Sequence, residues 1–160
     1  MMFHIVAVGR VRDPNLRAMC EDYAARVSRY SKLRIHEIPD GARRSKEPAT
    51  VLREEAAALL KAVPANARLI ALVRGGEQCG SRRFASRLNE WRESGRDLVF
   101  LLGGAYGLDT AVRERCEVEL SLSHMTFPHE VARLMLLEQI YRGNTILKGE
   151  PYHKGDRAPS

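Results

Sequence analysis

The chain has 160 residues, of which 44% are apolar and 29% charged, a length and balance typical of one soluble globular domain rather than of a disordered protein. Its longest apolar runs are far shorter than the roughly 20 residues that a membrane helix needs, and its first residues lack a signal-peptide pattern, so we expect a cytoplasmic protein with no membrane partner. The net charge of +6 is typical of polyanion-binding proteins and equally of proteins with solvated basic helix faces.

The first part of the chain predicts a strand, a helix, a second strand and a second helix. Residues 3–8 mix β-branched and apolar side chains and end at Gly9, which is typical of a buried strand. Asp13 and Pro14 then supply an N-cap and a first-turn proline to a helix with apolar side chains at helical spacing. The elements expected here are strands at 3–8 and 33–38, helices from 14 to about 30 and from 47 to 63, and a basic loop at 42–46.

The rest of the chain continues the alternation. Ser81 is expected to cap a helix that Gly95 ends, and Pro128 to begin a long last helix. The elements expected here are strands at 67–73, 97–102 and 118–122, helices at 81–94, from about 109 and at 128–147, and a loose tail at about 148–160. This order predicts a single α/β domain over residues 1–160, with a mostly parallel sheet that binds ligands beyond the carboxyl ends of its strands.

Two loops at that edge could carry chemistry. Residues 101–108, Leu-Leu-Gly-Gly-Ala-Tyr-Gly-Leu, hold three glycines in five positions, and so bare a backbone can approach a ligand closely. Their spacing is neither a dinucleotide fingerprint nor a P-loop. Residues 120–129, Leu-Ser-Leu-Ser-His-Met-Thr-Phe-Pro-His, could wrap an apolar ligand edge and bond it through main-chain groups. Both patterns are also typical of plain strand-to-helix connections.

The last helix and the tail contain further candidates. The helix is apolar around most of its circumference, which favours a central place in the core, half of a dimer interface, or both. Glu138 and Arg142 are four residues apart and could pair along it. The tail motif Pro-Tyr-His-Lys at 151–154 is either functional or part of a disordered end. Three widely spaced cysteines, and two histidines without a carboxylate at ligand spacing, predict neither a disulfide framework nor a metal site.

Four motifs in order give the chain a specific resemblance. They are the glycine loop at 101–108, the histidine loop at 120–129, Glu-Gln-Ile-Tyr-Arg at 138–142 and Pro-Tyr-His-Lys at 151–154. Together they resemble the bacterial SPOUT-class methyltransferases of large-subunit ribosomal RNA, and the resemblance covers nearly the whole chain. It implies an α/β fold with a trefoil knot, S-adenosylmethionine as methyl donor, no metal, and a homodimer. The implied reaction is methylation of N3 of a pseudouridine in the 23S rRNA of the assembled ribosome.

The same resemblance assigns the candidate site residues. The candidates for cofactor binding are Leu72, Gly103, Gly104, Leu122, Ser123, His124, Met125, Thr126 and Phe127. The catalytic candidates are Glu138, Arg142, Tyr152 and His153, the last two supplied by the partner subunit. Tyr152 or His153 would orient or deprotonate the acceptor ring, and Arg142 would contact phosphate or the developing charge. Lys154 stands where the family commonly has arginine, so the planar bidentate fork is lost there.

Two other functions remain open at this point. The same cofactor loops would suit a SPOUT methyltransferase that acts on transfer RNA. A non-catalytic ribosome-binding protein with a merely structural glycine loop would not bind S-adenosylmethionine at all. For each RNA-binding function, the basic clusters at 43–46 and 82–83 are candidate RNA surfaces.

Overall fold

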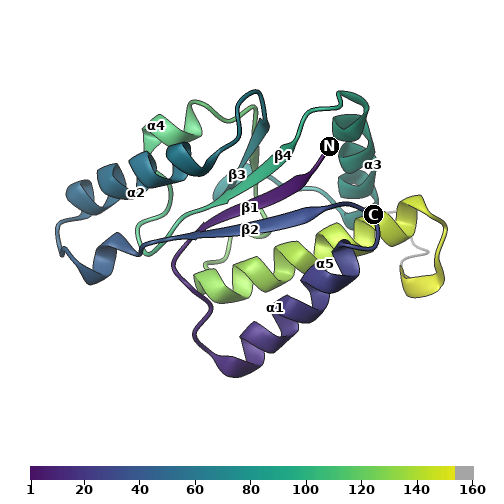
Figure 1. Cartoon of the computed structure of the whole chain (residues 1–160), viewed down its shortest axis with the longest axis horizontal. Helices are drawn as coiled ribbons and strands as arrows, with labels where there is room; N and C mark the ends of the chain where they lie inside the picture. The colour runs from purple at the N-terminus through teal and green to yellow at the C-terminus, as the bar shows by residue number, and fades with distance from the viewer. Residues whose placement is uncertain (154–160) are drawn as a thin grey trace.

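The structure is a computed structural model that describes residues 1–153. A parallel five-stranded sheet with the strand order β2-β1-β4-β3-β5 lies at its centre (Figure 1). The strands are β1 Phe3–Val8, β2 Leu33–Ile38, β3 Arg68–Glu77, β4 Leu98–Leu102 and β5 Val118–Leu120. The α-helices are α1 Pro14–Val27, α2 Pro48–Ala62, α3 Ser81–Glu93, α4 Thr110–Arg113 and α5 His129–Leu147, and two short 3-10 helices are η1 Gly41–Arg43 and η2 Pro151–His153. The predicted α/β class, parallel sheet and element order are confirmed.

The two faces of the sheet are covered by different helices because successive strand side chains point to opposite sides. Phe3 and Ile5 of β1 pack in one core with side chains of α1, α3 and α5. Val6 and Val8 of the same strand pack in a second core with α2 and α4. The side chains of β4 divide in the same way and all are buried, as its continuous apolar run predicts.

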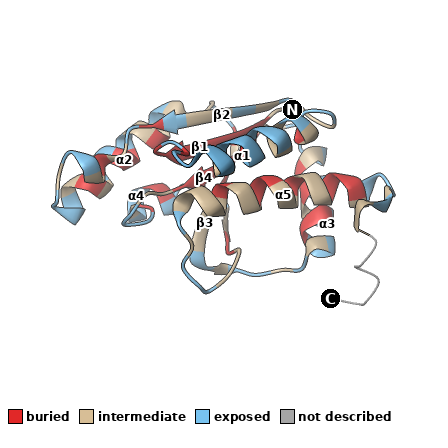
Figure 2. Cartoon of the chain, turned by 90° about the horizontal axis from the view of Figure 1, so that it is seen from below, coloured by how far each residue is buried: buried red, intermediate tan, exposed pale blue. Residues whose placement is uncertain are grey.

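The last helix, α5, is central to the first of these cores. It contacts both α1 and α3 and is buried or half-buried along most of its length (Figure 2). This position explains why its sequence is apolar around most of its circumference. No helix in residues 1–153 is long and apolar enough to cross a membrane.

Several expected element ends differ from the structure: β3 continues to Glu77 instead of ending near residue 73, β5 ends at Leu120, and two further differences have visible causes. Gly80, not Ser81, occupies the N-cap of α3, because the Ser81 hydroxyl donates to Oε1 of Gln139 on α5 at 2.7 Å. The tail is ordered through residue 153, because the Tyr30 hydroxyl donates to Glu150 at 2.6 Å and η2 packs against α5. The remaining tail, including Lys154, lies outside the described residues.

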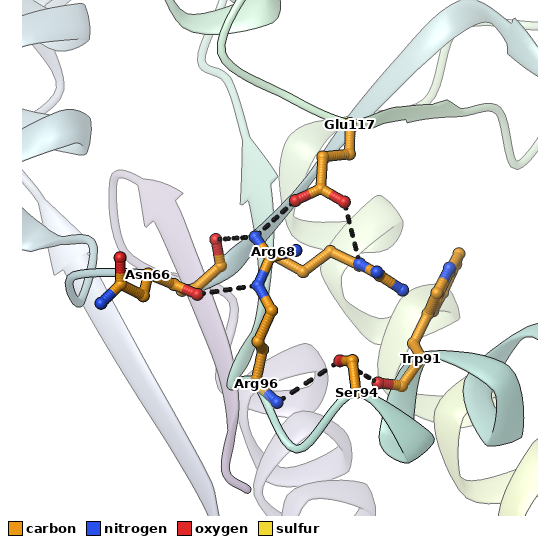
Figure 3. Close-up of polar contacts among 7 residues, drawn as sticks. Asn66, Arg68, Trp91, Ser94, Arg96 and Glu117 are labelled. Atoms are coloured by element: carbon orange, nitrogen blue, oxygen red, sulfur yellow. Dashed lines mark hydrogen bonds and ion pairs between the residues drawn. The ribbon is translucent and has the colours of Figure 1, made fainter.

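An ion-pair network closes the amino-terminal edge of the sheet beside β3, β4 and β5 (Figure 3). Glu117 accepts hydrogen bonds from Arg68 and Arg96, and Arg96 also donates to the carbonyls of Asn66 and Ala67. The bond from Arg96 outweighs partial burial and lowers the pKa of the Glu117 carboxyl. The network ties three strand starts together, at the edge opposite the glycine and histidine loops.

Candidate functional site

A cavity of about 640 Å³ opens at the carboxyl ends of β3, β4 and β5. Its walls are residues 72–75 of β3, the glycine loop at 102–108, residues 122–123 and 125–129 after β5, Arg113 of α4 and Ala132 of α5. Both the volume and the place at the carboxyl ends of parallel strands are typical of small-molecule sites in α/β proteins.

The glycine loop is folded back on itself, and two of its glycines leave no room for a side chain. A Cβ atom at Gly103 would overlap the main-chain carbonyl of Gly107. A Cβ atom at Gly104 would lie 2.8 Å from Cγ1 of Val8 on β1. The Gly107 N–H closes the turn by donating to the Gly104 carbonyl at 3.1 Å. The cavity wall at this point is therefore bare backbone, which a ligand can approach closely.

The segment after β5 is held over the end of β3 by hydrogen bonds. The Ser121 hydroxyl donates to the Arg74 carbonyl at 2.8 Å, and the Ser121 N–H donates to the Glu77 carbonyl at 3.0 Å. The Arg74 guanidinium in turn donates to Oγ1 of Thr126 at 2.8 Å. These bonds follow from the extension of β3 to Glu77, where its pairing register with β5 shifts. They fix the second wall of the cavity against the first.

The structure gathers eight of the nine candidate cofactor residues around this cavity. They are Leu72, Gly103, Gly104, Leu122, Ser123, Met125, Thr126 and Phe127. The ninth, His124, is exposed and does not line it. Sequence reasoning missed Arg74 and Arg113, which bring cations to the wall. Arg74 directly follows the end of the predicted strand at 67–73, so the sequence could have indicated that it lies at the cavity. Arg113 is held by an ion pair with Glu119, and no sequence pattern predicts that pair.

The catalytic candidates form a separate cluster near the end of α5. The Arg142 guanidinium donates twice to Oε1 of Glu138, at 3.0 and 2.7 Å, and the Tyr152 hydroxyl donates to the same oxygen at 3.2 Å. The Tyr152 ring packs edge-on against Tyr141, and its hydroxyl lies 3.2 Å from that of Tyr23 on α1. Three distant segments of one chain thus meet here, and none of these residues lines the cavity.

The two candidate bases, Tyr152 and His153, differ in their surroundings. Burial, the hydrogen bond with Tyr23 and the nearby carboxylate of Glu138 all raise the pKa of Tyr152 well above its usual range. A phenol held in this way keeps its proton at neutral pH and is suited to donate a hydrogen bond. His153 lies beside it in η2, and its Nδ1 atom is buried without a hydrogen-bond partner among residues 1–153. Tyr152 is therefore the less suited of the two to accept a proton.

Both clusters contain residues of α5, and the helix keeps them apart. His129 lies in its first turn and lines the cavity, whereas Arg142 lies 13 residues later. A rise of about 1.5 Å per residue separates the two positions by roughly 20 Å along the helix axis. Within one chain, Arg142 therefore lies far along α5 from the cavity residue His129.

A buried carboxylate lies behind the glycine loop. Glu55 of α2 is 3% exposed, and its Oε1 atom accepts from the Gly41 N–H at 3.1 Å. Its Oε2 atom has no partner among residues 1–153. A Cβ atom at Gly104 would lie 3.2 Å from Oε1, so this side chain supports the loop directly. Burial raises the pKa of the Glu55 carboxyl above its ordinary value of 4.5.

We expect Glu55→Gln to stabilise the protein by about 1 kcal/mol at pH 8, because the amide keeps the bond to Gly41 without a buried charge. The folded wild type takes up a proton at a higher pH than the unfolded chain does, so its stability rises as the pH falls toward 4.5. The advantage of the variant should therefore shrink between pH 8 and pH 5. Urea unfolding at both pH values measures this, with the exposed neighbour variant Glu54→Gln as control. A variant less stable than the wild type by the same amount at both pH values would contradict the buried charge.

Metal ligands are not grouped in the part of the chain that the structure describes. Among residues 1–153, no three His, Cys, Asp or Glu side chains are placed to hold one metal ion. The cysteines at 20, 79 and 116 are unpaired, and burial raises the pKa of Cys116 to about 11. A thiol with so high a pKa is protonated at neutral pH and is a poor nucleophile.

The chain is similar to known proteins over nearly its whole length. The family described as "Predicted SPOUT methyltransferase" matches residues 1–153. A ribosomal RNA large subunit methyltransferase H from Anaeromyxobacter sp. (strain Fw109-5) is 46% identical over 154 residues, which cover 96% of this chain and 100% of that protein. A protein of the same name from Gemmatimonas aurantiaca is 42% identical with the same coverage. The solved structure of a probable methylase family protein from Haemophilus influenzae Rd KW20 has the same fold, with a TM-score of 0.56 at 10% identity, over 99% of this chain and 72% of that one.

Proposed function

This chain belongs to the SPOUT methyltransferase family, and from that membership we propose that it methylates N3 of a pseudouridine in the large-subunit rRNA of the assembled ribosome. The observation that carries the proposal is the cavity at the carboxyl edge, which gathers eight of the nine candidate cofactor residues around a bare glycine backbone. Full-length relatives named for a large-subunit rRNA methyltransferase support the choice of substrate.

S-adenosylmethionine suits the residues that are present. Leu72, Leu122 and Phe127 offer apolar contacts, and the glycine backbone at 103–104 forms a wall without side chains. When bound, the cofactor supplies an already activated sulfonium methyl group. The protein then needs mainly to hold the acceptor nitrogen in line and to help it lose its proton.

The tail cluster would perform that second task. Tyr152 keeps its proton and would orient the acceptor ring by exchanging its hydrogen bond to Glu138 for one to that ring, and His153 would accept the N3 proton. Glu138 holds both Tyr152 and Arg142 in place through one carboxylate oxygen. Arg142 would contact phosphate or the charge that develops on the ring.

A homodimer would bring the cluster to the cavity. None of the tail-cluster residues lines the cavity of its own chain, which supports a dimer in which each tail reaches the cavity of the other copy. The trefoil knot that the resemblance implies stays a prediction, as does the cytoplasmic location.

The decisive test is methyl transfer from labelled S-adenosylmethionine to assembled ribosomes that lack the modification. Label should appear only in large-subunit rRNA, with isolated subunits and transfer RNA as controls. Label on transfer RNA would instead favour the second SPOUT function. Failure to bind S-adenosylmethionine would favour a non-catalytic ribosome-binding protein.

A further inference from the structure

A second cavity, of about 470 Å³, lies at the carboxyl ends of β1 and β2, at the end of the molecule where α5 begins (Figure 1). Its charged lining residues are Arg10, Arg12, Glu37, Asp40, Arg43 and Arg44. Four arginines from two separate loops thus line one cavity, although the sequence shows only the 43–46 cluster as a charge run.

The two carboxylates in this lining are already engaged. Glu37 accepts a bond of 2.6 Å from Arg133, a guanidinium that is 4% exposed and lies behind the cavity. Asp40 caps η1 through the Ala42 N–H at 3.0 Å and lies 3.9 Å from Nε of Arg43. The cavity therefore presents a net positive surface.

Three of its arginines are available to a ligand. Arg10, Arg12 and Arg44 are exposed, and none of their side chains has a hydrogen-bond or ion-pair partner within the described range 1–153. Arginine recognises phosphate through its planar fork, with two parallel bonds to two oxygens. Unpaired guanidiniums that share one hollow are suited to a ligand with several phosphate groups.

Hydrogen bonds to carboxylates of α5 and α2 hold the backbone of both loops that carry these arginines. Glu130 of α5 accepts hydrogen bonds from the main-chain N–H groups of Arg12 at 2.9 Å and Asp13 at 3.4 Å. On the other side, Glu55 accepts the Gly41 N–H and so holds the start of η1. The backbone of the two loops is thus held in place by the protein itself, and the arginine side chains extend from it.

The second cavity adjoins the glycine-loop cavity. A Cβ atom at Gly9, which lines the second cavity, would lie 3.4 Å from Cε1 of His129, which lines the first. Gly9 and His129 therefore lie in contact between the two cavities. A polymer that places one nucleotide at the first cavity can place its neighbouring phosphates in the second.

We propose that this arginine cavity binds phosphate groups of the RNA strand next to the nucleotide that is methylated, an inference that rests on the proposed function for the identity of the RNA. Contacts of this kind set the register of the RNA and supply affinity without reading its sequence. The cavity would thus position the substrate, while the cofactor cavity and the tail cluster carry the chemistry.

The test uses two double variants of the full chain, Arg10→Gln with Arg12→Gln, and Arg43→Gln with Arg44→Gln. The matched control is Arg29→Gln with Arg34→Gln, two exposed arginines at the opposite edge of the sheet. The probes are assembled ribosomes that lack the modification and a poly(U) oligonucleotide, each titrated from 50 to 200 mM KCl. Binding of S-adenosylmethionine is measured in parallel by calorimetry.

The Arg10 and Arg12 variant should bind both RNAs roughly tenfold more weakly near 100 mM KCl, and its slope of log K against log salt should fall by about 1.5, since two phosphate contacts are lost. The Arg43 and Arg44 variant should show about half that fall in slope, because Arg43 is already paired with Asp40. The control should match the wild type, and all variants should bind S-adenosylmethionine normally. If the wild type methylates ribosomes but the cavity variants keep its RNA affinity and salt slope, the arginine cavity is refuted and the proposed function stands. If the wild type methylates nothing but the variants still lose poly(U) binding, the proposed function fails and the phosphate site is supported.

Discussion

Gly103→Ala should weaken S-adenosylmethionine binding by about 100-fold, which corresponds to roughly 2.7 kcal/mol and lies within the range for an overpacked site. The new Cβ would overlap the Gly107 carbonyl, which is backbone and cannot rotate away as a side chain could. The turn between Gly104 and Gly107 would have to open, and the wall of the cavity would move with it. Isothermal titration calorimetry with S-adenosylmethionine measures the loss.

The chain offers a matched control for this change. Gly75 lines the same cavity, yet a Cβ atom there would have no neighbour within 4 Å. Gly75→Ala should therefore bind S-adenosylmethionine within about twofold of the wild type. Thermal unfolding of both variants separates a local change in the loop from a general loss of stability. Wild-type affinity in Gly103→Ala would show that the glycine loop is not the cofactor wall.

His153→Ala should lower the rate of single-turnover methylation by about 100-fold or more, the usual contribution of a positioned general base. Binding of S-adenosylmethionine should change little, because the proposed partner of His153 is the acceptor ring and not the cofactor. Tyr152→Phe should have a smaller effect, since the raised pKa of Tyr152 makes it a hydrogen-bond donor and not a base. An unchanged rate in His153→Ala would contradict the acid-base part of the mechanism.

Mixing these variants tests whether the site is shared between two chains. A dimer of one Gly103→Ala chain and one His153→Ala chain would have one site with both defects and one site with neither. Random exchange should restore about a quarter of the wild-type activity, because half of the dimers are mixed and each has one intact site. No restoration after verified exchange would mean that each chain uses its own tail.

The match between sequence and structure is closest where the determining interactions are local. The alternation of side chains along β1 and β4, and the proline and aspartate at the start of α1, depend on neighbours within a few residues. The glycine loop is local in the same sense, because its tight return joins Gly104 to Gly107. The class of fold could therefore be predicted from the amino-acid sequence, whereas the eight cavity residues were assigned by the resemblance to the SPOUT family.

The tertiary structure alone decided the contacts between distant segments. Gln139 takes the Ser81 hydroxyl and so overrides a good local N-cap. Tyr23, Glu138 and Tyr152 meet only because α1, α5 and η2 pack together, and that packing raises the pKa of Tyr152. The arginine cavity likewise joins two loops that are some thirty residues apart in the chain, because β1 and β2 are neighbours in the sheet. Sequence periodicity indicates which face of a helix or strand is buried, but not which other element covers that face. The N-cap of α3, the tail cluster and the arginine cavity all depend on which elements pack together.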